Sequence, residues 1–338
     1  MTARPTGATI FGCSGPVLTA DERAFYRDAD PFGFIVFARN VETPDQLRRL
    51  TSDLRDSVGR EAPVLVDQEG GRVQRLRAPH WREWLPPLDQ VEAAGPHAAL
   101  VMALRARVMA AELRAVGIDA NCAPCADLAL PETHPFLKNR CYGGNPGLVT
   151  GIARAVADGF LAGGVLPVIK HLPGHGRSSA DTHHDLPTVT VDRATLRDTD
   201  FAPFRALNDL PMAMTAHIVF AAHDADHPAT QSPEMIRVIR DEIGFSGLLM
   251  TDDLNMQALS GTLAERAARS IAAGCDIALH CKGDMAEMQA VAAAAGRMSA
   301  ATATRAAAAL RCRRDPEPAD IDALLAEFNA LSGAAHVR

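Results

Sequence analysis

Short apolar segments alternate with longer amphipathic segments along most of the chain, and this alternation restricts the possible folds more than any other feature. The short segments are apolar along most of their length and rich in β-branched residues. This pattern is typical of parallel strands that are buried on both faces and covered by helices. Eight such units close naturally into a (β/α)8 barrel. The eight expected strands comprise residues 8–14, 33–39, 63–68, 118–124, 166–172, 213–219, 247–253 and 276–281.

The longer segments carry the signals of helix ends. Thr43 and Ser232 each offer a capping hydroxyl and are followed by a proline that fits the first helical turn. Gly117, Gly163 and Gly274 stand where helices should end. A doubly wound open sheet is the alternative, but it would need a G-x-G-x-x-G loop, and the sequence has none. The expected helices comprise residues 21–30, 43–58, 98–117, 145–164, 192–209, 232–244, 262–274 and 284–295.

The chain shows no sign of a division into domains. No long Gly/Ser-rich or Pro-rich linker interrupts the 338 residues, and no internal repeat is visible. Length alone would allow two domains, but single barrels commonly reach about 250 residues or more. We therefore expect one catalytic barrel domain over residues 1–338, with a short helical extension from about residue 300.

The composition limits the partners and the location. A net charge of −7 gives no support for binding to nucleic acid or to an anionic membrane. The N-terminal segment lacks the apolar run of a signal peptide, and no stretch is long enough to cross a membrane. We expect a cytoplasmic protein with a substrate that is neutral or small. Its seven cysteines should be free thiols, with Cys122 and Cys125 buried in a strand.

Polar residues follow the apolar bodies of the expected strands. Active sites of barrels of this type lie at the C-terminal ends of the strands. Polar groups at one rim, above apolar strand bodies, are what a carbohydrate site would show. The residues at these ends are Asp67, Glu69, Asp127, Lys170, His171, His217, Asp252, Asp253 and His280.

Two of these strand ends have further features. Asp252 and Asp253 are adjacent, and because successive strand residues point to opposite faces, only one can point into the barrel mouth. That carboxylate could be a nucleophile or an electrostatic stabiliser, or else one Asp caps a helix and the other pairs with a base. Asp67, Arg72 and Arg75 flank a Gly-Gly turn, which lets the backbone approach a ligand or simply forms a turn with solvated arginines.

The run KHLPGHGRSSADTHHDLP, residues 170–187, could be a metal site, a proton-transfer device or a polar loop. Metal ligands are usually fixed by regular structure, but proline and glycine separate His171 from His175, so we expect no bound metal. The same proline and glycines predict a mobile loop from Leu172 to Ala180.

Proton transfer suits the second half of this run better. Asp181 and His183 are two positions apart, so their side chains would lie on the same side of an extended segment. A carboxylate held against one imidazole nitrogen fixes the tautomer and raises the basicity of the ring. Such a histidine can give and later take a proton near neutral pH. His184 fits a polar surface position.

Four motifs in fixed order resemble those of the family 3 glycoside hydrolases: VDQEGGRVQRL, KHLPGHG, DTHHDLP and TDDLNM. More narrowly, they resemble the bacterial single-domain β-N-acetylglucosaminidases (β-hexosaminidases) of peptidoglycan recycling. The resemblance covers most of the chain. It implies a retaining double displacement on a (β/α)8 barrel. We expect no cofactor and no metal.

The resemblance also implies roles for individual residues. Asp252 matches the nucleophile, His183 matches the acid/base, and Asp181 matches the residue that orients His183. The positions expected to hold the N-acetylglucosamine ring and its acetamido group are Asp67, Arg75, Arg140, Lys170 and His171.

The chain departs from the family pattern at two places. Leu172 stands where the family usually has Phe, and residues 139–142, Asn-Arg-Cys-Tyr, are looser than the usual Asp-Arg-Ser-Phe. The expected substrate is an N-acetylglucosaminyl-1,6-anhydro-N-acetylmuramoyl peptide. A phosphorylase that uses phosphate in place of water, or a sugar-binding barrel without catalysis, are the alternatives.

Overall fold

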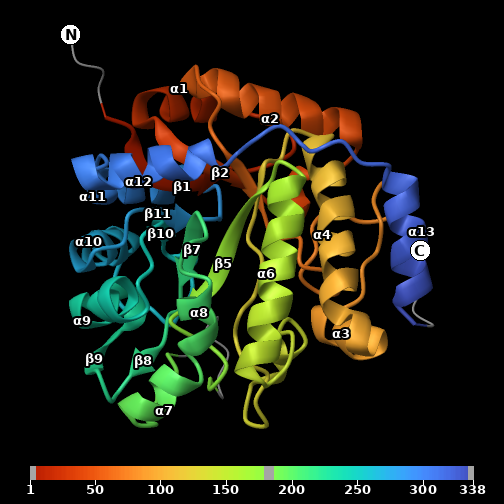
Figure 1. The fold of residues 1–338 in the computed structure, drawn as a ribbon. Coiled ribbons are helices and arrows are strands. Elements are labelled where there is room, and N and C mark those ends of the chain that lie inside the picture. Colours follow the sequence, from red (N-terminus) through yellow and green to blue (C-terminus); the bar gives the residue numbers. More distant parts are fainter. Residues whose placement is uncertain (1–4, 179–185, 334–338) are drawn as a thin grey trace.

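The computed structural model describes residues 5–178 and 186–333. Its centre is a sheet in which all neighbouring strands are parallel, in the order β10-β7-β5-β4-β3-β2-β1-β11. A parallel bridge between Met250 and Ile277 joins the two edge strands, so the sheet curls into a nearly closed barrel (Figure 1). The strands are β1 (Gly7–Gly12), β2 (Pro31–Val36), β3 (Val64–Val66), β4 (Ala120–Asn121), β5 (Leu166–Leu172), β7 (Met212–Thr215), β10 (Leu248–Met250) and β11 (Ala278–His280).

All eight expected strands are present, which confirms the (β/α)8 barrel. Most are shorter than the apolar segments that predicted them. The chain nevertheless continues alongside its neighbours beyond β4, because the Cys122 N–H donates to Val66 and the Ala126 N–H donates to Lys170, each at 2.8 Å. The polar residues that follow β3, β4 and β5 therefore reach the same end of the barrel.

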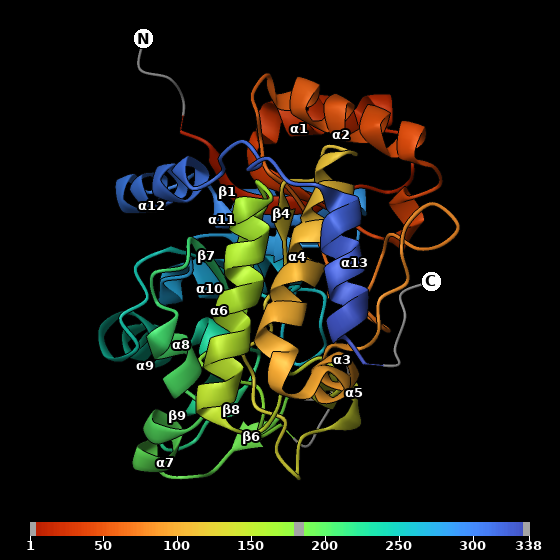
Figure 2. The same cartoon turned by 45° about the vertical axis from the view of Figure 1, so that its right-hand side comes forward.

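Helices alternate with the strands and cover the outside of the barrel (Figures 1 and 2). The Thr43 and Ser232 side chains cap α2 and α9 as expected, and α6 and α10 end at Gly163 and Gly274. The helices are α1 (Ala20–Ala29), α2 (Pro44–Val58), α3 (Pro87–Ala94), α4 (Ala98–Arg114), α5 (Pro135–Lys138), α6 (Pro146–Ala162), α7 (Arg193–Asp198), α8 (Ala202–Ala206), α9 (Pro233–Arg237), α10 (Leu263–Ala273), α11 (Met285–Ala295), α12 (Ala300–Arg311) and α13 (Ile321–Leu331).

Several local features differ from the expectation, and the short helices α3 and α5 were not among the expected helices. The helix expected over residues 192–209 is divided into α7 and α8, and the one over 232–244 continues from α9 into a π-helical turn at Val238–Glu242. A small second sheet was not expected. It consists of β6 (Thr188–Val189), β8 (Val219–Phe220) and β9 (Asp224–Pro228).

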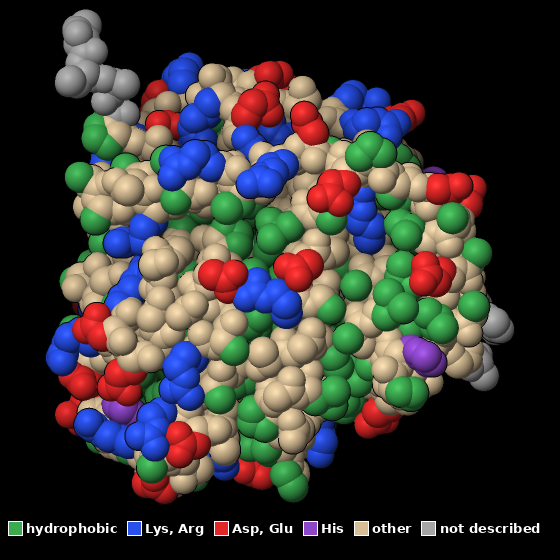
Figure 3. Space-filling model, in the orientation of Figure 1, with side chains coloured by type: hydrophobic (Ala, Val, Ile, Leu, Met, Phe, Trp, Pro, Cys, Tyr) green, Lys and Arg blue, Asp and Glu red, His purple; other side chains and the backbone are tan. Residues whose placement is uncertain are grey.

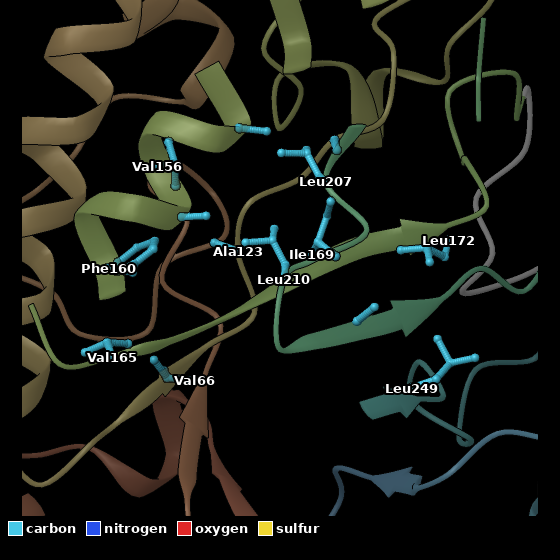
Figure 4. Close-up of a cluster of buried hydrophobic side chains, with 14 of the residues drawn as sticks. Val66, Ala123, Val156, Phe160, Val165, Ile169, Leu172, Leu207, Leu210 and Leu249 are labelled. Carbon is cyan, nitrogen blue, oxygen red and sulfur yellow. The ribbon is translucent and has the colours of Figure 1, made fainter. Parts of the chain in front are cut away.

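Apolar side chains pack on both sides of the strands. Inside the barrel, Ile10, Val168 and Cys122 belong to one buried cluster, while Phe11 and Ile169, which follow Ile10 and Val168 in the chain, belong to the cluster between strands and helices. Figure 4 shows part of the outer cluster, in which Ile169, Leu210 and Phe160 lie between β5 and its covering helices. Burial on both faces explains why these strands appear as continuous apolar runs.

The last two helices pack against the outside of the barrel. Helix α13 runs beside α4 (Figure 2). The Phe328 ring of α13 also contacts Trp84, which precedes α3, edge to face with ring centroids 5.4 Å apart. Among the described residues, no helix is both long and apolar enough to cross a membrane. All seven cysteines are free thiols, as expected, and Cys122 and Cys125 are buried. Charged groups of both signs are mixed over the face that carries α6 (Figure 3).

Candidate active site

A pocket opens at the C-terminal ends of the barrel strands. Its empty space, open mouth included, is about 720 Å³, which is within the usual range for small-molecule sites. Phe37, Phe136 and Met256 give it apolar walls. The structure brings together at this pocket all six predicted site residues that lie in its described part: Asp67, Arg75, Arg140, Lys170, His171 and Asp252.

A network of ion pairs forms one wall of the pocket. The Lys170 ammonium group at the end of β5 lies 2.9 Å from Asp67 and 2.6 Å from Glu69. Arg140 binds both carboxylate oxygens of Glu69, at 2.8 and 2.9 Å, and Arg75 lies 3.1 Å from Asp67. Each charge has an opposite partner, so the wall is rigid before a ligand arrives.

The charges in this wall are stable at neutral pH. Burial tends to raise the pKa of Asp67 and Glu69, but the cations beside them outweigh burial, holding the Asp67 pKa well below its usual range and lowering that of Glu69 to about 2. Burial tends to lower the pKa of Lys170, but these two carboxylates raise it above the usual lysine value. The wall therefore presents fixed ionic groups to a polar ligand.

The turn after β3 brings Arg75 back to Asp67. Gly70 and Gly71 have positive φ angles of 108° and 57°, which other residues rarely adopt. A Cβ atom at Gly70 would also lie 2.6 Å from the Leu85 carbonyl oxygen and overlap the Arg105 guanidinium group. The Gly-Gly pair is therefore needed for a tight turn packed on buried Arg105.

His171 is oriented by Asp127, a residue that follows β4. The His171 Nδ1 atom lies 2.6 Å from the Asp127 carboxylate, and both groups are buried. Burial tends to raise the Asp127 pKa, but the His171 and His175 rings and the backbone N–H of His175 lower it to about 2. The ionised carboxylate holds the Nδ1 proton, which directs the Nε2 atom of His171 into the pocket.

Asp252 follows β10 and faces this imidazole across the pocket. Its carboxylate lies 4.0 Å from His171 Nε2 and accepts the Asp253 N–H at 2.8 Å. Burial tends to raise the Asp252 pKa, but His171 and His217 outweigh it and lower the pKa, so the carboxylate is ionised at neutral pH. The Asp253 carboxylate instead accepts the N–H groups of Asn255 and Cys281, each at 3.2 Å.

His217, after β7, supports the loop that carries Asp252. Its Nδ1 atom lies 2.7 Å from the Thr230 hydroxyl, and its Nε2 atom lies 3.2 Å from the Asp253 carbonyl oxygen. Burial lowers its pKa, which favours the neutral ring. The sequence placed Glu69, Asp127 and His217 at the polar rim but gave them no role. The residues that each of them contacts are distant in the chain, and only the fold brings them together.

Residues 170–178 of this run are packed, which differs from a mobile loop beginning at Leu172. Leu172 ends β5 and is buried. His175 is also buried, and its N–H donates to Asp127 at 2.7 Å, while burial lowers its pKa to about 4. Asp181 and His183 lie outside the described residues, so their pairing and roles stay predictions.

A (β/α)8 barrel with an ionised carboxylate beside fixed charges, in a pocket at the C-terminal ends of the strands, fits one half of the catalytic pair of a glycoside hydrolase. A model of the glycosyl hydrolase family 3 N-terminal domain matches residues 20–313. The chain belongs to this family. It is 36% identical to a β-hexosaminidase of Methylococcus capsulatus over 322 residues, which is 94% of each chain.

Solved structures agree with this assignment. Native NagZ from Neisseria gonorrhoeae is 29% identical, with a TM-score of 0.83 over 97% of this chain and 96% of that one. The same protein has been solved with N-trifluoroacetyl-D-glucosamine, at a TM-score of 0.83, and with a zinc ion, at 0.81; identity and coverage are the same for both. The chain is therefore a family 3 glycoside hydrolase of the β-hexosaminidase type.

Proposed function

We propose that the protein is a retaining exo-β-N-acetylglucosaminidase that forms a covalent glycosyl ester on Asp252. Its substrate would be a cytoplasmic N-acetylglucosaminyl-1,6-anhydro-N-acetylmuramoyl peptide from peptidoglycan recycling. The observation that carries the proposal is the ionised Asp252 carboxylate, in a pocket that is also lined by the ion-paired residues Asp67, Arg140 and Lys170. The family and the N-trifluoroacetyl-D-glucosamine complex of the Neisseria relative support an N-acetylglucosamine ring in this pocket.

The charged wall suits the non-reducing sugar. The Asp67 carboxylate can accept hydrogen bonds from sugar hydroxyls, while Lys170 and Arg140 can donate to hydroxyl or acetamido oxygens. His171 can bond a ring substituent through Nε2 and lies close enough to Asp252 to hold the sugar beside it. Because ion pairs fix Asp67, Lys170 and Arg140 before binding, these side chains lose little conformational entropy when the substrate binds.

The reaction would take two steps. An Asp252 oxygen forms a bond to the anomeric carbon while the glycosidic carbon–oxygen bond breaks, and protonated His183 gives its proton to the leaving oxygen. In the second step, water attacks the same carbon and breaks the glycosyl–Asp252 ester, while neutral His183 takes the water proton. Two inversions give net retention, and Asp252 leaves as a carboxylate.

The Asp252→Ala variant tests the nucleophile. We expect hydrolysis of 4-nitrophenyl N-acetylglucosaminide to fall by about 10⁴-fold or more, because no group remains to form the ester. Calorimetric binding of N-acetylglucosamine should change little, since Asp67, Lys170 and Arg140 are intact. Asp226→Ala, at an exposed carboxylate, is the control. Trapping with a 2-acetamido-5-fluoro glycosyl substrate should label Asp252, and a label on another residue would reject the assignment.

The His183→Ala variant tests the acid. Natural disaccharides have poor leaving groups that need protonation, whereas 4-nitrophenolate does not. We therefore expect a loss of about 10²–10⁴-fold on the disaccharide and a much smaller loss in the formation of the ester from the aryl glycoside. Equal losses on both would mean that His183 is not the acid.

Two additions to the assay separate the alternatives. Phosphate should not accelerate turnover or yield a sugar 1-phosphate, which a phosphorylase would produce. EDTA should not diminish activity, because no step of the mechanism uses a metal. The second addition is needed because the Neisseria relative has been solved with zinc.

A further inference from the structure

Behind the pocket wall lies a buried group of potential metal ligands. Cys125, Asp127 and His171 each offer one ligand atom, and these atoms lie within 4.8 Å of one another. Cys125 Sγ is 3.3 Å from the Asp127 carboxylate, which is 2.6 Å from His171 Nδ1. In the described part of the chain, this is the one group of at least three such residues at this spacing.

A second thiol lies beside this group. Cys141 belongs to the same small buried cluster as Cys125, and their side chains interact directly. Cys141 is held by the turn that also carries Arg140, whereas Cys125 follows β4, so the fold brings the two thiols together from separate loops. Both are buried, at 0% and 1% exposure. The set thus comprises two sulfur atoms, one imidazole nitrogen and one carboxylate oxygen.

We propose that Cys125, Cys141, Asp127 and His171 bind a thiophilic divalent cation such as Zn²⁺, and that this binding inhibits the enzyme. Two thiolates with one imidazole and one carboxylate form a four-ligand set that suits tetrahedral zinc, with bonds of about 2.0–2.3 Å. The ligand atoms of Cys125, Asp127 and His171 already lie within 4.8 Å of one another. Cys141 is not in that group but contacts Cys125, so its side chain would have to turn toward the ion. His171 lines the pocket and the other three ligands do not, so its ring would have to turn for the cation to reach the buried thiols.

Inhibition follows because the site takes His171, which lines the pocket, and Asp127, which orients His171. The cation takes the Nδ1 lone pair of His171 and a carboxylate oxygen of Asp127, so the hydrogen bond between them is lost. As the bonds to the metal form, the two thiols release their protons to solvent. The Nδ1 proton leaves while Nε2 carries one, so the coordinated imidazole stays neutral. In the structure, His171 Nε2 lies 3.5 Å from Arg140 and 4.0 Å from Asp252. A ring turned by the metal would no longer match these neighbours. This step rests on the proposed role of His171 in holding the sugar.

Cobalt(II) titration of the reduced protein tests the site without using activity. We expect one equivalent to produce a thiolate-to-cobalt charge-transfer band and the visible bands of a tetrahedral ion, both abolished by Zn²⁺. The Cys125→Ser variant should either lose the charge-transfer band or bind cobalt at least about tenfold more weakly, which is the scale of loss when contacts at metal sites are removed. Cys141→Ser should weaken cobalt binding similarly.

Two other buried thiols provide matched controls. Cys122 lies inside the barrel three residues before Cys125, and Cys281 lines the pocket. Cys122→Ala and Cys281→Ala should keep the band. If the band is absent from the wild-type protein, survives in Cys125→Ser, or is lost with Cys122 or Cys281, the proposed ligand set is wrong. Thermal unfolding checks the fold of each variant, and Cys125→Ala replaces Cys125→Ser if the serine variant does not fold.

Inhibition is measured on the same proteins. The concentration of Zn²⁺ that halves the wild-type rate should rise at least about tenfold in Cys125→Ser, each protein being compared with its own metal-free rate, and EDTA should restore the wild-type rate. Equal inhibition of the two proteins would mean that the inhibitory metal binds elsewhere, and would overturn the proposal that binding at this site inhibits the enzyme. Because the cobalt spectrum needs no turnover, failure of the proposed glycosidase function leaves the test of the site intact.

Discussion

At the scale of single residues, the neighbouring carboxylates of Asp252 and Asp253 have opposite properties. The His171 and His217 rings beside Asp252 outweigh burial and lower its pKa. Asp253 is as deeply buried but has mainly two backbone N–H groups as partners, so burial raises its pKa to about 6. Adjacent positions in the chain thus become an ionised group facing the pocket and a carboxyl that resists ionisation.

Replacement of Asp253 by Asn should change how stability depends on pH. The difference between about 6 and the ordinary 3.8 corresponds to at most about 3 kcal/mol. Between these pH values the folded protein keeps a proton that the unfolded chain has released, so the contribution of Asp253 to stability is lost as pH rises. The Asn side chain can accept the same two N–H groups without a charge. The variant should therefore gain stability relative to wild type from pH 4 to 6.5, measured by urea unfolding.

The Asp252→Asn variant is the matched control for this slope. Because the Asp252 pKa is lowered, its own titration changes stability only below about pH 4, and any change from pH 4 to 6.5 comes from the histidines beside it. The slope should therefore be smaller than that for Asp253→Asn. A flat difference for Asp253→Asn would contradict the raised pKa.

At the scale of the elements, apolar runs predicted the strands well, because the strands are buried on both faces. They also placed Asp252 and Lys170 at the correct rim. The pairs Glu69–Arg140 and Asp127–His171 could not be predicted, because each joins loops that only the closed barrel brings together.

Two of the differences between the expected and observed elements have local reasons. Pro203 lacks an N–H, and its ring would clash with the carbonyl of Thr199 in a continuous helix, so α7 and α8 separate. Strand β9, Asp-Ala-Asp-His-Pro, is polar along most of its length and lacks the alternation that marks a strand.

The link between the loop after β4 and the segment after β5 can be tested at Gly176. A Cβ atom there would lie 2.3 Å from the carbonyl oxygen and 2.9 Å from the nitrogen of Leu128, next to Asp127. Gly176→Ala must therefore displace backbone, which should cost about 1–3 kcal/mol of stability. Because Asp127 orients His171, kcat/KM should also fall by about 10–100-fold. Thermal unfolding and steady-state kinetics measure the two effects.

Gly151 is the matched control, because it lies on the exposed side of α6 and a Cβ atom there meets nothing within 4 Å. Gly151→Ala should stabilise the protein by about 0.5–1 kcal/mol and leave the kinetics unchanged. If both variants behave alike, the contact at Gly176 does not support the site.

At the scale of the whole molecule, the two ends of the barrel use charge differently. At the C-terminal end of the strands, ion pairs line a pocket. At the opposite end, buried Asp119 binds Arg55 and Arg313, and buried Asp276 binds Arg240 and Arg305. Arg305 and Arg313 come after the last strand, so their pairs hold that part of the chain against the bottom of the barrel. Side chains on this face of the fold serve stability and not chemistry.

This division predicts that stability and catalysis can be changed separately. Asp276 precedes β11, and its carboxylate accepts the Leu249 N–H at 3.0 Å and contacts Arg240 and Arg305. Asp276→Asn leaves both arginines without their charge partner and should cost about 2–3 kcal/mol, below the range for fully buried pairs because both guanidinium groups are partly exposed.

Thermal unfolding should show this loss as a lower Tm. At a temperature where the Asp276→Asn variant is folded, kcat and KM should stay within about twofold of the wild-type values, because Asp276 lies at the opposite end of the barrel from the pocket. Arg305→Gln, which removes one exposed partner and keeps the carboxylate, should lower Tm by less. A fall in kcat/KM of the folded Asp276→Asn variant as large as that expected for Gly176→Ala would show that the two ends of the barrel are coupled.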